Sequence, residues 1–181
     1  VVLGGGVAGG NAALVAAALG AEVTVFDTDR DKLVMARALG ANVTGLYPHL
    51  SDVADAVRQA DIAIGAVLVT GARAPHVITA EMVRTMQRGS VIVDISVDQG
   101  GCVETTKPTT YDAPTYVWEG VTHFAVTNMP GAVPRTSSQA LSAAIAPYAS
   151  RLAESGWRDD AGLARGINID GGKVVHPALM S

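Results

Sequence analysis

The sequence begins with a glycine-rich turn between a short apolar run and a helical pattern. Residues 4–9 are Gly-Gly-Gly-Val-Ala-Gly, which contains G-x-G-x-x-G after the apolar residues 1–3 and before the alanine-rich run 11–19. In this pattern one glycine permits a tight turn, the next lets the backbone approach a pyrophosphate, and the third packs helix on strand. The N-terminus of the following helix offers unpaired N–H groups and partial positive charge to phosphates. In a chain with 20 glycines the hexapeptide alone is a weak indicator, so its meaning depends on the residues around it.

An acidic residue follows the glycine turn at the spacing that dinucleotide-binding folds use. Asp27 comes directly after the β-branched run 22–26, about 20 residues beyond the turn. A carboxylate there accepts hydrogen bonds from both ribose hydroxyls and repels a 2′-phosphate. The nearest basic residue is Arg30, so the sequence predicts NAD rather than NADP as cofactor. The alternative role of Asp27, capping the next helix, is compatible with ribose binding.

Apolar runs and helical patterns alternate along the chain, which is typical of βαβ units. The predicted strands cover residues 1–3, 22–26, 42–46, 61–69, 90–95 and 123–127, and the predicted helices cover 11–19, 31–39, 53–59 and 79–86. Parallel strands joined by right-handed crossovers give an α/β fold of the Rossmann type, a doubly wound, mostly parallel sheet with helices on both faces. The cofactor crevice then lies where the strand order reverses.

The pattern changes after Pro134, which predicts a Rossmann domain over 1–134 and a C-terminal helical segment over 135–181. Thr136-x-x-Gln139 is a capping box, so we expect one long helix over 137–154 with a kink at Pro147. The remaining glycine-rich tail has no regular pattern. Because the segment has no strand for the sheet, we expect it to dock elsewhere.

Composition excludes several classes of protein. Hydrophobic residues make up 49% of the chain and charged residues 17%, which disordered chains do not combine. A net charge of −4 does not provide the excess of positive charge that nucleic-acid binding needs. No apolar run reaches the roughly 18 residues of a membrane helix. The single cysteine, Cys102, excludes an internal disulfide and indicates the cytoplasm. The four histidines have no metal-ligand spacing, so we predict no metal site and expect surface or loop positions for them.

Two further polar groups follow predicted strands. Asp98 lies just past the strand 90–95, where it is either a turn residue before two glycines or a carboxylate beside the nicotinamide. Asn128 precedes Met129-Pro130 after the last strand, where it either forms a turn or binds a carboxamide or ribose. Lys32 and Lys107 are either solvated or contact the cofactor. Cys102 is a reactive thiol or, the interpretation we favour, a small loop residue.

Together these segments resemble the L-alanine dehydrogenase family. The resemblance covers residues 1 to about 158 and is carried by GGGVAGGNAA, VTVFD, DIAIGAVLVTGARAPHVIT, GSVIVDISVDQGGCVETTKPTTYDAPTY and AVTNMPGAVPRTSSQAL. The proton-translocating transhydrogenase has a similar first domain, but its counterparts of these motifs differ.

The resemblance implies the positions that hold the cofactor. Asp98 matches the family's catalytic aspartate, Lys107 stands where relatives have a basic cofactor contact, and His49 stands where they have a small hydroxyl residue near the adenine. The full set of expected cofactor positions is Gly4, Gly6, Val7, Ala8, Gly9, Asp27, Lys32, Val67, Leu68, Ile95, Ser96, Val97, Asp98, Lys107, Val126, Thr127, Asn128 and Met129.

The resemblance also implies NAD-dependent oxidative deamination of L-alanine to pyruvate and ammonium, in a homo-oligomer that is a hexamer or a dimer. The family's catalytic lysine and histidine lie in an N-terminal substrate domain, which this sequence lacks. Because the first strand is also shorter than a typical strand, we interpret the chain as a fragment that binds NAD with little or no turnover. The alternatives are a non-catalytic NAD-binding or oligomerisation module and a transhydrogenase-like domain.

Overall fold

The computed structural model describes residues 1–69 and 75–180. The chain forms two compact units, Val1–Asn128 and Met129–Ser181, and each is described by itself. The resemblance segment DIAIGAVLVTGARAPHVIT includes residues 70–74, which lie outside the described residues.

The first unit alternates strands and helices along its length. Its elements are β1 (Val2–Leu3), α1 (Val7–Ala18), β2 (Val23–Phe26), α2 (Arg30–Arg37), β3 (Val43–Leu46), α3 (Leu50–Gln59), β4 (Ile62–Gly65), α4 (Ala80–Thr85), β5 (Val91–Asp94), the 3₁₀ helix η1 (Ile95–Gln99), β6 (Thr115–Trp118) and β7 (Val121–Phe124). The strands form one seven-stranded sheet in the order β3-β2-β1-β4-β5-β7-β6. All neighbours are parallel except β6 and β7. The predicted Rossmann-type α/β fold is confirmed.

The strand order reverses between β1 and β4, because β1 pairs with β2 on one side and with β4 on the other. Val2 lies opposite Val25 of β2 and opposite Ile64 of β4. In open α/β sheets the ligand crevice lies outside the carboxyl ends of the strands at such a reversal. The parallel strands β1, β2, β4, β5 and β7 all end at that edge, so the loops after them define the candidate site.

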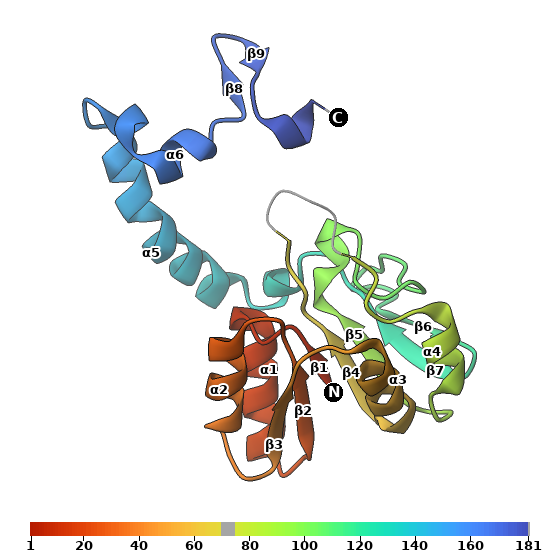
Figure 1. Ribbon diagram of the computed structural model, residues 1–181. Helices are drawn as coiled ribbons and strands as arrows, with labels where there is room; N and C mark the ends of the chain where they lie inside the picture. The colour runs from red at the N-terminus through yellow and green to blue at the C-terminus, as the bar shows by residue number, and fades with distance from the viewer. Residues whose placement is uncertain (70–74, 181) are drawn as a thin grey trace. The chain divides into compact units, whose positions relative to one another are not determined.

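Helices cover both faces of the sheet and create two separate cores (Figure 1). Val2 and Val25 pack with Ala13 of α1 and Ala36 of α2 on one face. Leu3 and Phe26 pack with residues of α3 and α4 on the other. Adjacent strand residues point to opposite faces, so the continuous apolar runs of the sequence serve both cores.

Several elements of the first unit differ from the sequence prediction. The predicted strand 61–69 is shorter, because β4 ends at Gly65 and residues 66–69 belong to no strand. Helix α1 starts at Val7 rather than at residue 11. The sequence predicted a later start because two glycines, which disfavour helix, lie inside the first turns. Helix α3 starts at Leu50 rather than at residue 53. The predicted strand 123–127 corresponds to β7, which instead covers Val121–Phe124, and the preceding strand β6 was not predicted. The two strands form a hairpin, whose turn residues Glu119 and Gly120 both have positive φ, 49° and 84°. Two such residues define a type I′ turn, which usually contains asparagine or aspartate before glycine.

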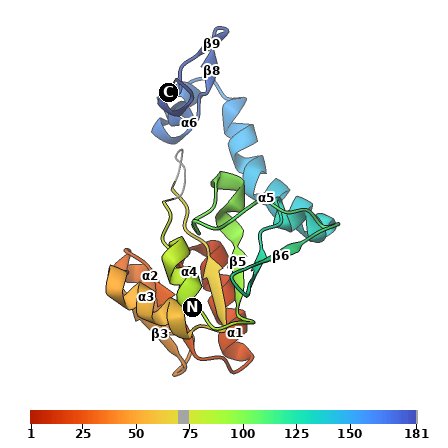
Figure 2. The same cartoon turned by 90° about the vertical axis from the view of Figure 1, so that its right-hand side faces the viewer.

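The second unit is helical with a small hairpin (Figure 2). It contains η2 (Met129–Ala132), α5 (Pro134–Leu152), η3 (Trp157–Asp159), α6 (Ala161–Arg165), β8 (Ile169–Asp170), β9 (Lys173–Val174) and η4 (Pro177–Leu179). The predicted capping box is wrong: α5 starts at Pro134, and its N-cap Val133 makes no side-chain hydrogen bond. Proline suits the first helical position because its missing N–H would be unpaired there.

The tail that we expected to be irregular is ordered by polar contacts. Both guanidinium Nη atoms of Arg158 donate to Asp170 of β8, each at 2.9 Å. Asp160 caps α6 by accepting hydrogen bonds from the N–H groups of Gly162 and Leu163. Within the described residues, no helix combines the length and apolar character needed to cross a membrane.

Candidate functional site

The glycine turn is pressed against the start of the loop after β4. Gly4 has φ +97°, and a Cβ on it would stand 2.5 Å from the Ala66 carbonyl oxygen. A Cβ on Gly9, in the first turns of α1, would overlap the Gly4 carbonyl oxygen. Gly6, the N-cap of α1, has no heavy atom within 4 Å of such a position. The turn therefore needs glycine for packing at two positions and leaves open space at the third.

The N-terminus of α1 fits an anionic ligand. No side chain caps the helix, and its first turn contains no acidic residue. Val7, the first helical residue, is exposed. Unpaired N–H groups at an open helix N-terminus, beside a glycine without a side chain, suit a pyrophosphate. A cleft of about 460 Å³ begins at Gly5 and Gly6 and runs between α1 and α2.

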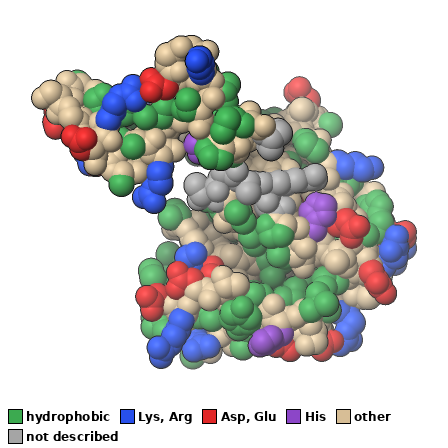
Figure 3. Space-filling view, turned by 45° about the horizontal axis from the view of Figure 1, so that its top comes forward, with side chains coloured by type: hydrophobic (Ala, Val, Ile, Leu, Met, Phe, Trp, Pro, Cys, Tyr) green, Lys and Arg blue, Asp and Glu red, His purple; other side chains and the backbone are tan. Residues whose placement is uncertain are grey.

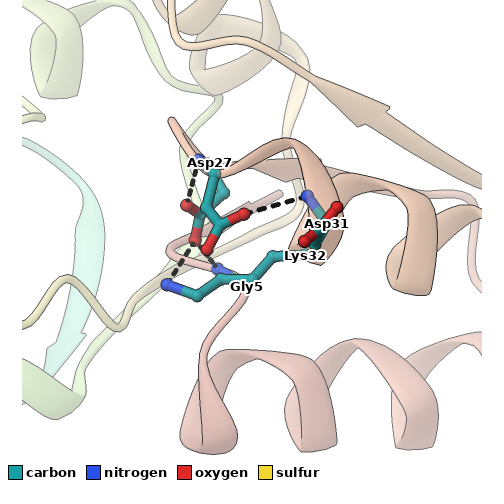
Figure 4. Close-up of polar contacts among 5 residues, drawn as sticks. Gly5, Asp27, Asp31 and Lys32 are labelled. Atoms are coloured by element: carbon teal, nitrogen blue, oxygen red, sulfur yellow. Dashed lines mark hydrogen bonds and ion pairs between the residues drawn. The ribbon is translucent and has the colours of Figure 1, made fainter.

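Asp27 follows β2 and connects that strand to the glycine turn (Figure 4). Its Oδ2 accepts a hydrogen bond from the Gly5 N–H at 2.7 Å and forms an ion pair with Lys32 Nζ at 3.6 Å. Its Oδ1 accepts the Asp29 N–H at 2.8 Å. The structure thus brings the predicted ribose acid, the glycine turn and Lys32 together. It also shows that Asp29, rather than Asp27, caps α2.

Polar contacts also join the loops after β4, β5 and β7. Ser96 Oγ donates to the Val67 carbonyl oxygen at 2.8 Å. Asp98 accepts the Asn128 N–H through both carboxylate oxygens, each at 3.2 Å. Asn128 has φ +52°, a left-handed conformation that asparagine tolerates better than most residues. Asp98 is therefore held at the carboxyl edge while it stays exposed to solvent.

Asp94, which the sequence did not predict as a functional residue, organises the loop that carries Asp98. Asp94 ends β5, is fully buried, and accepts hydrogen bonds from the N–H groups of Ser96, Cys102 and Val103 and from the Thr106 hydroxyl. The Cys102 thiol also donates to it at 3.6 Å, and these donors together compensate the burial of a carboxylate that has lost its water. A single acidic residue ending the apolar run SVIVD was the available signal for it.

Cys102 lies beside Asp94 and is fully buried. Burial, with the negative charge of Asp94, raises the pKa of the Cys102 thiol to about 12. Because the thiolate is the nucleophile, the favoured interpretation of Cys102 as an unreactive loop residue agrees with its surroundings.

The remaining predicted cofactor positions differ in exposure. Leu68 and Thr127 are exposed after β4 and β7, whereas the side chains of Val97 and Val126 are buried. Residues 95–98 all lie in η1 (Ile95–Gln99), directly after β5. Val67 and Ile95 are partly buried, as is Met129, which belongs to the second unit.

Lys107 and His49, the two remaining predicted positions with ionisable side chains, make local contacts only in the part of the chain that the structure describes. Lys107 is exposed, and its backbone N–H donates to the Tyr116 hydroxyl at 2.8 Å. His49 is the N-cap of α3 and lies beside Tyr47, with ring centroids 5.1 Å apart. Among the described residues, no contact joins Lys107 or His49 to the group formed by Asp27, Gly5 and Lys32. In residues 1–69 and 75–180, no three His, Cys, Asp or Glu side chains are grouped to hold a metal ion.

A doubly wound sheet, a glycine turn that exposes a helix N-terminus, and an acid at the end of β2 define a dinucleotide-binding domain of the Rossmann type. The sequence profile described as "Alanine dehydrogenase/PNT, C-terminal domain" matches residues 1–177. The chain belongs to this family, as its motifs predict.

Individual relatives agree with the family assignment. Alanine dehydrogenase from Halomonas elongata is 49% identical over 98% of this chain and 49% of its own length. A solved L-alanine dehydrogenase structure matches with a TM-score of 0.85 and 48% identity, covering 99% of this chain and 51% of that one. A transhydrogenase from Sinorhizobium meliloti matches with a TM-score of 0.79 and 28% identity, over 98% and 49% of the two chains. The chain thus spans about half the length of the relatives it matches.

Proposed function

We propose that this chain forms the NAD-binding half of an enzyme that deaminates L-alanine. The overall reaction converts L-alanine, NAD⁺ and water to pyruvate, ammonium, NADH and a proton, and it is reversible. The observation that carries the proposal is the Asp27 carboxylate, fixed by the Gly5 N–H at the end of β2. Higher identity to alanine dehydrogenases than to the transhydrogenase supports L-alanine as the substrate.

Different residues at the carboxyl edge of the sheet would bind different parts of the dinucleotide. Gly4, Gly6 and Gly9, with Val7 and Ala8, would hold the pyrophosphate at the N-terminus of α1. Asp27 would accept the adenosine ribose hydroxyls, with Lys32 beside it and Val67 and Leu68 along the adenosine. The nicotinamide half would be held by Ile95, Ser96, Val97, Asp98, Val126, Thr127, Asn128 and Met129, and Lys107 would supply a positive charge.

Asp98 is the group that we assign to the chemical step. When bound, the nicotinamide ring would exchange a hydride with the substrate carbon. The Asp98 carboxylate, held by the Asn128 N–H and exposed at the sheet edge, would bind the substrate ammonium group. It would then take up or return a proton at the amino or imino nitrogen. Asp94 would keep the Asp98 turn in place through the hydrogen bonds that it accepts from the following loop.

The substrate carbonyl and carboxylate would be bound by the other half of a full-length relative. The second unit would return to that half, and its exposed apolar residues Leu141 and Ile145 on α5 would be covered there. We further propose a cytoplasmic homo-oligomer, a hexamer or a dimer. A single buried cysteine with a high pKa is compatible with a reducing compartment.

An NADH fluorescence titration of the 181-residue chain tests the cofactor assignment. We expect a saturable change in wild type and its loss in Asp27→Ala, which removes the ribose acceptor. Asp55→Ala is the matched control, because Asp55 is also an acid in an ion pair, but on the outside of α3. If wild type shows no change, or if Asp27→Ala binds like wild type, the assignment is wrong.

A further inference from the structure

Lys32 is held by the same carboxylate that would bind the ribose. Its Nζ lies 3.6 Å from Asp27 Oδ2, and the two side chains are 42% and 8% exposed (Figure 4). The Gly5 and Asp29 N–H groups fix both oxygens of Asp27. Asp27 is therefore the immobile partner of the pair, and Lys32 is the partner with room to move.

The charges around this pair nearly balance. Residues 27–32 contain three aspartates and two basic residues, so their net charge is −1. A 2′-phosphate on the adenosine ribose would face Asp27, and the ammonium group beside it is already paired. Lysine is a common phosphate ligand in proteins, so its pairing here matters for cofactor choice.

We infer that Asp27 and Lys32 together set the cofactor preference, and that Lys32 is a latent ligand for a 2′-phosphate. Asp27 excludes the phosphate by its own charge and also by occupying the ammonium group. Neutralising Asp27 brings the local charge to zero and releases Lys32 toward the ribose. This inference rests on the proposed NAD-binding function, since it concerns the same ribose position.

A simpler mechanism makes a different prediction. If Asp27 acts by repulsion alone, its neutralisation improves NADPH binding whether or not Lys32 is present. If the pair acts together, the improvement requires a basic side chain at position 32. Substitutions at both positions therefore separate the two mechanisms.

The test titrates NADH and NADPH into the 181-residue chain and follows cofactor fluorescence. Variants are Asp27→Asn, Lys32→Met and the double variant, with Lys173→Met on β9 as a matched lysine control. We expect Asp27→Asn to bind NADPH at least tenfold more tightly than wild type. Lys32→Met should remove most of that gain, Lys32→Arg should keep it, and added salt should weaken it.

A second neutral variant guards against a local defect. An asparagine amide can point its NH₂ group at the Gly5 or Asp29 N–H, so Asp27→Ser is made in parallel and both are checked by thermal unfolding. A gain in NADPH affinity that survives Lys32→Met, or no gain in either folded variant, overturns the inference while NADH binding by wild type still stands. Absence of NADH binding in wild type removes the proposed function, and the inference with it.

Discussion

At the scale of single residues, His123 shows how a polar side chain can belong to the core. It lies on β7 with 1% of its surface exposed, contrary to the surface or loop position expected for the histidines. Its Nδ1 contacts the Val121 carbonyl oxygen at 3.1 Å and therefore carries the proton. Its Nε2 then accepts from the Thr105 hydroxyl at 2.8 Å, and the Tyr116 ring stacks on it. The neutral imidazole thus satisfies both ring nitrogens.

Burial lowers the pKa of His123 below its ordinary value of 6.5, although the Val121 carbonyl and Asp94 oppose the shift. As the pH falls through 6.5, the unfolded chain takes up a proton that the folded chain does not. Stability is therefore lost from about that pH down to the folded pKa, by up to about 1.4 kcal/mol per pH unit from this group. Urea unfolding between pH 8 and 5 should show the decline.

His123→Asn provides the comparison, because it removes the titrating group from the core. We expect the variant to be less stable than wild type at pH 8, since it fills the site poorly. Its stability should fall less steeply below pH 6.5, and equal slopes for the two proteins would show that His123 titrates normally.

At the scale of elements, neighbouring glycines of α1 have opposite requirements. Gly9→Ala should destabilise the first unit by about 1–3 kcal/mol and abolish NADH binding, because its Cβ would overlap the Gly4 carbonyl oxygen. Gly10→Ala should stabilise the helix by up to about 1 kcal/mol, since its Cβ would stand 3.4 Å from the nearest atom. Urea unfolding and NADH titration measure both. Equal stability of the two variants would contradict the packing described for the turn.

Elements with a strong local pattern could be predicted from the sequence, and those fixed by tertiary contacts could not. The run EVTVF identified β2, and Thr79 marked the start of α4, where its side chain caps the helix. Strand β6 was missed because its turn uses Glu119 rather than asparagine or aspartate before glycine. The capping box at Thr136 failed because Pro134, two residues earlier, already suits the first helical position.

The site divides in the same way. The glycine turn and Asp27 could be found because their chemistry requires fixed residue types at fixed spacing. Lys32 was a candidate from the sequence, but its ion pair with Asp27 was not predicted, because it depends on how the β2–α2 turn folds. The Ser96 contact with Val67 could not be predicted either, because it joins the loops after two different strands. The role of Asp94 was not predicted, because the groups that donate to it come from a loop without a recognisable pattern.

At the scale of the whole molecule, each of the two units leaves apolar helix side chains open to solvent, and Figure 3 shows hydrophobic side chains on the face that it draws. Leu14 and Val15 of α1 and its C-cap Leu19 are exposed. On α5 the exposed apolar residues are Leu141, Ile145, Tyr148 and Leu152. Helices of soluble proteins usually bury one apolar side and show a polar side to water. Surfaces of this kind mark interaction sites, which agrees with a chain that spans about half the length of its relatives.

The half-length of the chain leads to a prediction about activity. The 181-residue chain should bind NADH yet form no NADH from NAD⁺ and L-alanine, because the substrate-binding groups implied by the family lie elsewhere. Co-expression with the N-terminal half of a close relative should restore turnover, measured at 340 nm. The same complex with Asp98→Asn should lose most of it. Alanine-dependent turnover by the chain alone, at ordinary dehydrogenase rates, would refute the proposal that the substrate-binding groups lie outside this chain.

The reversal of strand order between β1 and β4 also bears on how the protein folds. The loops of the site follow β1, β2, β4, β5 and β7, which are distant in sequence and meet only when the sheet is complete. Contacts of such long sequence separation form late and slow folding. No partly assembled sheet would present all of these loops, so tight binding would require the complete sheet of the first unit. A bound dinucleotide would then stabilise the strands that pair last, and it would slow their unfolding.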